Sequence, residues 1–197
     1  MKPTGKNWWG GADLYSFPAI HDPSTGVYIA DSWLIAEYLE KQYPDTPSLF
    51  PNGTKGLQEA FTYAFLQSVQ PMRKYLLPAT PARLSPRSAD YFRRTREVYF
   101  GKKLELVSPK GEAAIQDWAN IEQGFNQNAK WFSQTDEKGP FMLGDTLSWA
   151  DINAVGFFLW MKFIFGDDSE EWKRIASWSG GRWNTLMKAL DRYSEIQ

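Results

Sequence analysis

The chain has 197 residues, of which 43% are hydrophobic and 16% aromatic, and its formal net charge is −1. This length allows one globular domain, or two small ones, with a buried core. The near balance of acidic and basic residues argues against a basic nucleic-acid-binding protein. The chain has no cysteine, which excludes disulfides, thiolate metal ligands and a cysteine nucleophile.

His21 is the single histidine, so a multi-histidine metal site is excluded and a Ser-His-Asp triad would have to use this residue. No apolar run reaches the roughly 18 residues of a membrane span, and the N-terminus lacks the apolar core of a signal peptide. We therefore expect a soluble, cytoplasmic protein without a metal site and without nucleic-acid or membrane partners. The ten tryptophans are expected to fill a helical core.

The first quarter of the chain predicts a β-hairpin. Residues 1–13 contain proline, glycine and tryptophan without periodicity, and we expect a loop. The run 14–21 predicts a strand, and 27–30 predicts the returning strand after a turn that contains proline and glycine. Pro18 would lie inside the first strand, and a proline there belongs at an edge, a bulge or a cis bend.

A helix is expected directly after the hairpin. Asp31 or Ser32 suits its N-cap, apolar residues recur on one face of the segment that follows, and Pro44 ends it. A helix N-terminus offers unpaired N–H groups and partial positive charge, which suit a carboxylate ligand. The proline-rich stretch 44–54 predicts a linker that separates an N-terminal domain (1–43) from a C-terminal domain (55–197).

The C-terminal domain is predicted to be all-α. The expected helices cover 55–77 with a disturbance at Pro71, 85–107, 110–133, 148–165, 168–178 and 181–194. Ser148 and Asp151 form an S-x-x-D capping box before the most apolar of these helices. We interpret this pair as a structural capping device and not as catalytic residues.

Two motifs resemble those of glutathione S-transferases. The first combines Phe17-Pro18, a short hairpin and Asp31-Ser32 at the start of a helix. The second is Gly144-Asp145-Thr146-Leu147-Ser148-Trp149-Ala150-Asp151, similar to the Gly-Asp-x-x-Ser-x-Ala-Asp motif that opens the central C-terminal helix in that family. The resemblance covers nearly all of the chain. It implies a thioredoxin-like α/β N-terminal domain, here a β-hairpin plus a helix, followed by an all-α C-terminal domain.

The same resemblance implies a glutathione site and transferase chemistry. It assigns glutathione binding to Phe17 (through its backbone), Pro18, Asp31 and Ser32. Glutathione would be the co-substrate, a small hydrophobic electrophile would be the acceptor in a detoxification role, and the intact fold would form a homodimer. The segment 15–26 and residues 94–97 are similar to the fungal and bacterial β-etherase-like branch, in which ethers would be cleaved.

The resemblance further implies that this chain is truncated and lacks the first β-α-β of the N-terminal domain. Because that piece carries the residue that stabilises the glutathione thiolate, no catalytic residue is assigned. Two alternatives to a transferase therefore stay open. One is a non-catalytic, ligandin-like binder of hydrophobic molecules, and the other is a helical protein-interaction scaffold.

A run of basic residues between 83 and 103 is interleaved with aromatic residues. We interpret it as a solvated helix face with a buried aromatic stripe, because the whole chain is not basic and Glu97 and Glu105 can supply ion-pair partners. A minor alternative is an arginine that holds an acidic ligand or crosses a dimer interface.

Overall fold

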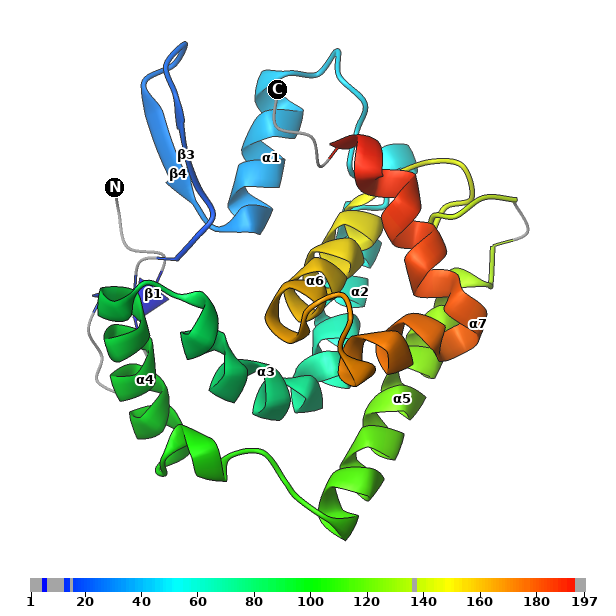
Figure 1. Cartoon of the computed structure of the whole chain (residues 1–197). Helices are drawn as coiled ribbons and strands as arrows, with labels where there is room; N and C mark the ends of the chain where they lie inside the picture. Colours follow the sequence, from blue (N-terminus) through cyan, green and yellow to red (C-terminus); the bar gives the residue numbers. More distant parts are fainter. Residues whose placement is uncertain (1–4, 7–12, 15, 136–137, 194–197) are drawn as a thin grey trace. The chain divides into compact units, whose positions relative to one another are not determined.

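The computed structural model describes residues 5–6, 13–14, 16–135 and 138–193 (Figure 1). The chain divides into two compact units, Met1–Pro51 and Asn52–Gln197. The division falls within the proline-rich stretch 44–54, which the sequence marks as a linker.

In its described residues, the first unit has two short antiparallel β-pairs and one α-helix (Figure 1). β1 (Gly5–Lys6) pairs with β2 (Asp13–Leu14), and β3 (Ala19–Asp22) pairs with β4 (Val27–Ala30). α1 (Ser32–Gln42) follows β4 after the single residue Asp31. The predicted hairpin and the helix after it are therefore confirmed.

Two expectations for this unit are wrong in detail. The loop predicted over 1–13 contains β1 and the start of β2. The strand predicted over 14–21 is divided, because β2 ends at Leu14 and β3 begins at Ala19. Pro18 lies just before β3 instead of within a strand, since a proline has no N–H to donate to a ladder. The Phe17–Pro18 peptide bond is cis, one of the three settings predicted for this proline.

The second unit is built from α-helices and short 3₁₀ turns. The α-helices are α2 (Lys55–Val69), α3 (Arg73–Ala79), α4 (Pro86–Phe100), α5 (Glu112–Phe132), α6 (Trp149–Phe165) and α7 (Glu170–Leu190). α6 contacts α2, α3 and α7, and α5 contacts α2 and α7 (Figure 1). No helix in the part of the chain that the structure describes is long and apolar enough to cross a membrane.

Proline and glycine set several helix boundaries, of which two agree with the sequence prediction and one differs. Pro71 lies in a 3₁₀ turn, Gln70–Met72, that separates α2 from α3. α4 stops at Phe100, short of the predicted residue 107, because Gly101 adopts a left-handed conformation with φ 64°. The backbone of α7 leaves the helical conformation from Trp178 to Gly181, where the sequence predicts a break between two helices.

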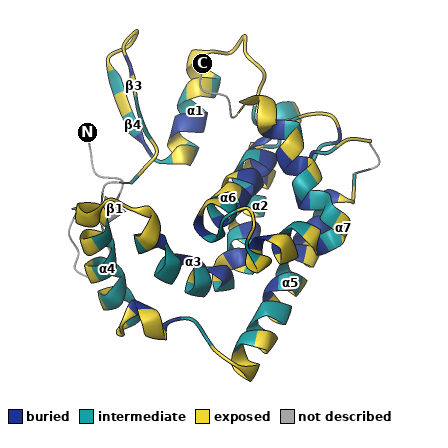
Figure 2. Cartoon of the chain, in the orientation of Figure 1, coloured by how far each residue is buried: buried dark blue, intermediate teal, exposed yellow. Residues whose placement is uncertain are grey.

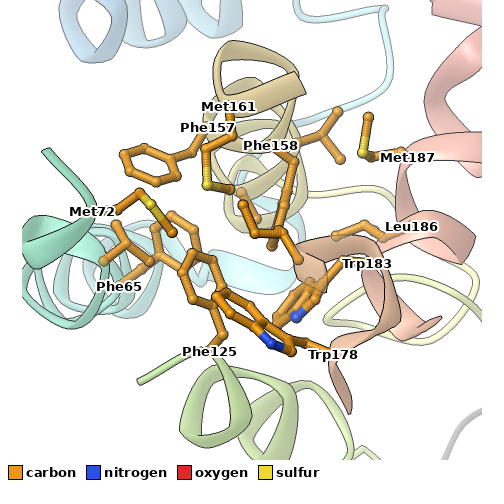
Figure 3. Close-up of a cluster of buried hydrophobic side chains, with 14 of the residues drawn as sticks. Phe65, Met72, Phe125, Phe157, Phe158, Met161, Trp178, Trp183, Leu186 and Met187 are labelled. Carbon is orange, nitrogen blue, oxygen red and sulfur yellow. The ribbon is translucent and has the colours of Figure 1, made fainter. Parts of the chain in front are cut away.

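Aromatic side chains form the core of the second unit. Phe125, Phe158 and Trp183 point toward one another (Figure 3), with ring centroids 5.3 Å apart for Phe125–Phe158 and 4.8 Å apart for Phe158–Trp183. Four tryptophans are buried in this unit: Trp149, Trp172, Trp178 and Trp183. Tryptophan therefore fills the space between helices, as expected from composition.

The start of α6 is fixed by a buried carboxylate. The side chain of Asp151 accepts hydrogen bonds from the N–H of Ser148 at 2.8 Å and from the Ser148 hydroxyl at 2.7 Å, within a reciprocal capping box. The same carboxylate accepts the N–H of Met142 at 2.7 Å, so it also holds the loop that precedes α6. Burial raises the pKa of the Asp151 carboxyl.

Candidate functional site

The first unit brings the start of β3 next to the start of α1. The N–H of Asp31 donates to the carbonyl oxygen of Pro18 at 3.1 Å, and the register of the hairpin places Ala19 opposite Ala30. The pairs Phe17-Pro18 and Asp31-Ser32 are therefore adjacent in space, although the hairpin separates them in the sequence.

Phe17 presents its main chain at this place. Neither its N–H nor its carbonyl oxygen forms a hydrogen bond with another residue in the described part of the chain. Its side chain is 91% exposed. A free N–H and a free carbonyl on one residue can pair with the main chain of an extended peptide, as in the addition of a strand to a sheet edge.

Asp31 is both the N-cap of α1 and a strained residue. Its Oδ1 accepts the N–H of Trp33 at 2.9 Å and the N–H of Leu34 at 3.2 Å. Its backbone has φ 85° and ψ 124°. Such a conformation costs a non-glycine residue on the order of 1–3 kcal/mol and is concentrated at functional sites. Oδ2 accepts no hydrogen bond from any residue that the structure describes, so this oxygen can receive a cationic donor.

Ser32, the first residue of α1, is exposed. Its backbone N–H and its hydroxyl form no hydrogen bond within the described ranges. These two donors stand at the positive end of the helix and suit a carboxylate. Together, Asp31 Oδ2 and the donors of Ser32 are complementary to the ammonium and carboxylate groups of an amino-acid zwitterion.

Asp22 supports this arrangement, and sequence analysis missed it. Its Oδ1 accepts the N–H and the hydroxyl of Ser24 at 2.9 and 2.6 Å, and its Oδ2 accepts the hydroxyls of Tyr38 and Tyr43 at 2.7 and 2.8 Å. Hydrogen bonds from Ser24, Tyr38 and Tyr43 hold the pKa of this carboxyl well below its usual range. They tie the turn of the hairpin to α1 and to the residue that ends it.

The sequence of the second unit identifies the family. The family model "Glutathione S-transferase, C-terminal domain" matches residues 56–193 of this chain. The chain belongs to the glutathione S-transferase family. It is 30% identical over 201 residues to the glutathione S-transferase-like protein ustS of Aspergillus flavus, a match that covers 95% of this chain and 70% of that protein.

Solved structures of fungal glutathione S-transferases are similar along the whole chain. CsGST63524 of Ceriporiopsis subvermispora, solved in complex with glutathione, is 41% identical with a TM-score of 0.91, and the match covers 100% of this chain and 78% of that one. GSTFuA3 of Phanerochaete chrysosporium is 36% identical with a TM-score of 0.90, and the match covers 100% and 77%. The family and the two-part fold predicted from the motifs are therefore confirmed.

Proposed function

We propose that this glutathione S-transferase-like chain binds reduced glutathione through Phe17, Pro18, Asp31 and Ser32. The observation that carries the proposal is the set of unused polar groups at the start of α1, namely Asp31 Oδ2 and the N–H and hydroxyl of Ser32, beside the free main chain of Phe17. A similar protein, CsGST63524, was crystallised with glutathione, which supports the choice of ligand.

The chemistry of glutathione matches these groups one by one. Its γ-glutamyl end is an amino-acid zwitterion, whose carboxylate would accept the two donors of Ser32 and whose ammonium group would donate to Asp31 Oδ2. Its cysteinyl unit has an amide N–H and a carbonyl, which would pair with the main chain of Phe17. Pro18 would not contact glutathione through a polar group of its own. Its carbonyl oxygen accepts the N–H of Asp31 and so keeps Phe17 beside the start of α1.

We further propose that the bound glutathione is transferred to a small hydrophobic electrophile, with ether cleavage as the reaction of the β-etherase-like branch. A thiol with a pKa of about 8.5 is mostly protonated at neutral pH, and its thiolate is the nucleophile. Attack on the electrophilic carbon forms a carbon–sulfur bond and releases the leaving group, which is a phenolate when the substrate is an aryl ether. The segment 15–26 supports the assignment to this branch.

Calorimetric titration with reduced glutathione tests the binding step. Ser32→Ala removes a hydroxyl that has no partner among the described residues, so the fold is retained. We expect glutathione affinity to fall about ten- to a hundredfold, since a hydrogen bond to a charged group contributes about 1.5–3 kcal/mol. Ser177→Ala, which removes an exposed hydroxyl in the second unit, is the matched control and should leave affinity unchanged. Equal affinities for all three proteins would overturn the assignment of Ser32.

A second assay separates the transferase from the ligandin-like alternative. The protein is incubated with glutathione and an activated aryl halide, and separately with a model aryl ether, and thioether formation is followed. Thioether from either substrate supports the transfer step. Saturable binding of an apolar dye without any thioether would replace the transferase with the ligandin-like binder.

We also propose a homodimer in the cytoplasm as the working form of the protein. Analytical ultracentrifugation and fractionation of cells that express a tagged chain test these two proposals. A monomer at all concentrations contradicts the first, and recovery outside the cytosolic fraction contradicts the second.

A further inference from the structure

None of the residues of α4 is buried (Figure 2), so the buried aromatic stripe expected for this segment is wrong. Its exposed apolar side chains include Tyr91 and Val98, which are 61% and 63% exposed. A helix without buried residues contributes little to a hydrophobic core, so its charged and apolar surface residues are not explained by packing.

Some of the charges around α4 form ion pairs with one another. Glu97 accepts the side chains of Arg93 at 3.3 Å and Lys103 at 2.9 Å, and Arg93 also reaches Glu105 at 2.6 Å. The expected ion-pair partners Glu97 and Glu105 are therefore confirmed.

Arg94 and Lys102 have no carboxylate partner in the described part of the chain, and both are exposed. Arg94 lies over the ring of Tyr91 with its guanidinium carbon 5.6 Å from the ring centroid, and Lys102 follows the left-handed Gly101. After Gly101, the side chain of Lys103 reaches back to Glu97 at 2.9 Å and the N–H of Leu104 donates to the same carboxylate at 3.4 Å, so this segment lies against the last turns of α4.

These four cations line one open pocket of about 590 Å³. The other lining residues are Asp90, Glu97 and Val98, so four basic and two acidic side chains leave its walls positively charged. Val98 adds an exposed apolar surface to this charged wall.

We propose that this pocket binds a small organic phosphate or sulfate monoester. The guanidinium of Arg94 and the ammonium of Lys102 would hold the oxyanion, because neither cation has a carboxylate partner among the described residues. The guanidinium group can also donate two parallel hydrogen bonds to two oxygens of the phosphate or sulfate. The apolar part of the ester would lie on Val98. The pocket belongs entirely to the second unit, whereas the residues proposed for glutathione belong to the first.

Calorimetric titration of the full chain with phenyl phosphate tests the proposal. Arg94→Gln and Lys102→Gln should each weaken binding about tenfold, as expected for one charge-assisted contact. Arg87→Gln removes an exposed cation from the same helix but outside the pocket, and should change affinity less than about twofold. Loss of affinity in Arg87→Gln equal to that in Arg94→Gln would show non-specific attraction and overturn the proposal.

Two more ligands separate the parts of the pocket. Inorganic phosphate should bind more weakly than phenyl phosphate, and Val98→Thr should weaken phenyl phosphate but not inorganic phosphate, because only the ester reaches the apolar surface. Failure of phenyl phosphate to saturate the protein overturns the proposal. Binding to phosphatidic acid vesicles without binding of phenyl phosphate also overturns it, in favour of a lipid surface.

Discussion

Asp31 combines three properties in one residue. Its Oδ1 caps α1, its backbone adopts φ 85°, and its Oδ2 is unused by any described residue. Aspartate and asparagine tolerate a positive φ better than other non-glycine residues and are strong N-caps. The position therefore accepts few substitutions, and two of them separate its structural role from its role in binding.

Asp31→Asn should preserve the fold and weaken binding. The amide oxygen still caps α1, so the free energy of unfolding should change by less than about 0.5 kcal/mol. Glutathione affinity should fall about tenfold or more, because the charge that faces the ammonium group is lost. Asp31→Ala should in addition lower the free energy of unfolding by about 1–2 kcal/mol. Urea unfolding and calorimetry on both variants check this, and full affinity in Asp31→Asn would contradict it.

Asp22 should make stability depend on pH. Its pKa is lowered in the folded protein by the hydrogen bonds from Ser24, Tyr38 and Tyr43, whereas an unfolded aspartate has a pKa of about 3.9. The folded state therefore binds fewer protons. The stabilisation is complete above the unfolded pKa and is lost as the pH falls below it toward the folded pKa.

The comparison with Asp22→Asn isolates this contribution. We expect the free energy of unfolding of the wild type to be higher than that of Asp22→Asn. This difference should be constant above about pH 5 and should become smaller as the pH falls below about 4. Urea unfolding at a series of pH values measures both proteins. A difference that does not change with pH would show that the Asp22 carboxylate is not stabilised in the folded state.

At the scale of elements, α5 approaches α2 at a glycine. A Cβ at Gly124 would lie 2.6 Å from the backbone carbonyl oxygen of Ser68, whereas a Cβ at Gly156 on α6 would meet no atom within 4 Å. Gly124→Ala should lower the free energy of unfolding by about 1–3 kcal/mol through overpacking. Gly156→Ala should raise it by about 0.5–1 kcal/mol, because alanine is the better helix former. Urea unfolding measures both variants. Changes of the free energy of unfolding in the same direction for Gly124→Ala and Gly156→Ala would contradict the helix packing described.

Helix boundaries could be predicted from the sequence only where one residue decides them. The N-cap at Asp31 and the capping box of Ser148 and Asp151 are local features, and both are present in the structure. The end of α4 was placed too late, because apolar and charged residues continue the helical pattern past Gly101. Glycine stops a helix when it takes a left-handed conformation, and the periodicity alone does not show whether it does.

At the scale of the whole molecule, the candidate site could be predicted because its groups are close in sequence or belong to a recognisable motif. Asp22 was missed, because Tyr38 and Tyr43 reach it only after the hairpin has folded beside α1. The pocket on α4 lies in the basic run 83–103, where the sequence left open an arginine that holds an acidic ligand. Which residues line it could not be predicted, because Lys102 comes to the same pocket as Arg94 only after the turn at Gly101. Contacts between residues far apart in sequence leave no periodic signal in the chain.

The central claim is that the main chain of Phe17 and the start of α1 together hold glutathione. The most direct test follows the backbone amide resonances of Phe17 and Ser32 by nuclear magnetic resonance while reduced glutathione is added. We predict saturable shifts of both amides with one common dissociation constant, and no shift of the Ser177 amide. Saturable binding that leaves Phe17 and Ser32 unmoved would contradict the site, and no binding up to about millimolar ligand would contradict glutathione as the ligand of this chain.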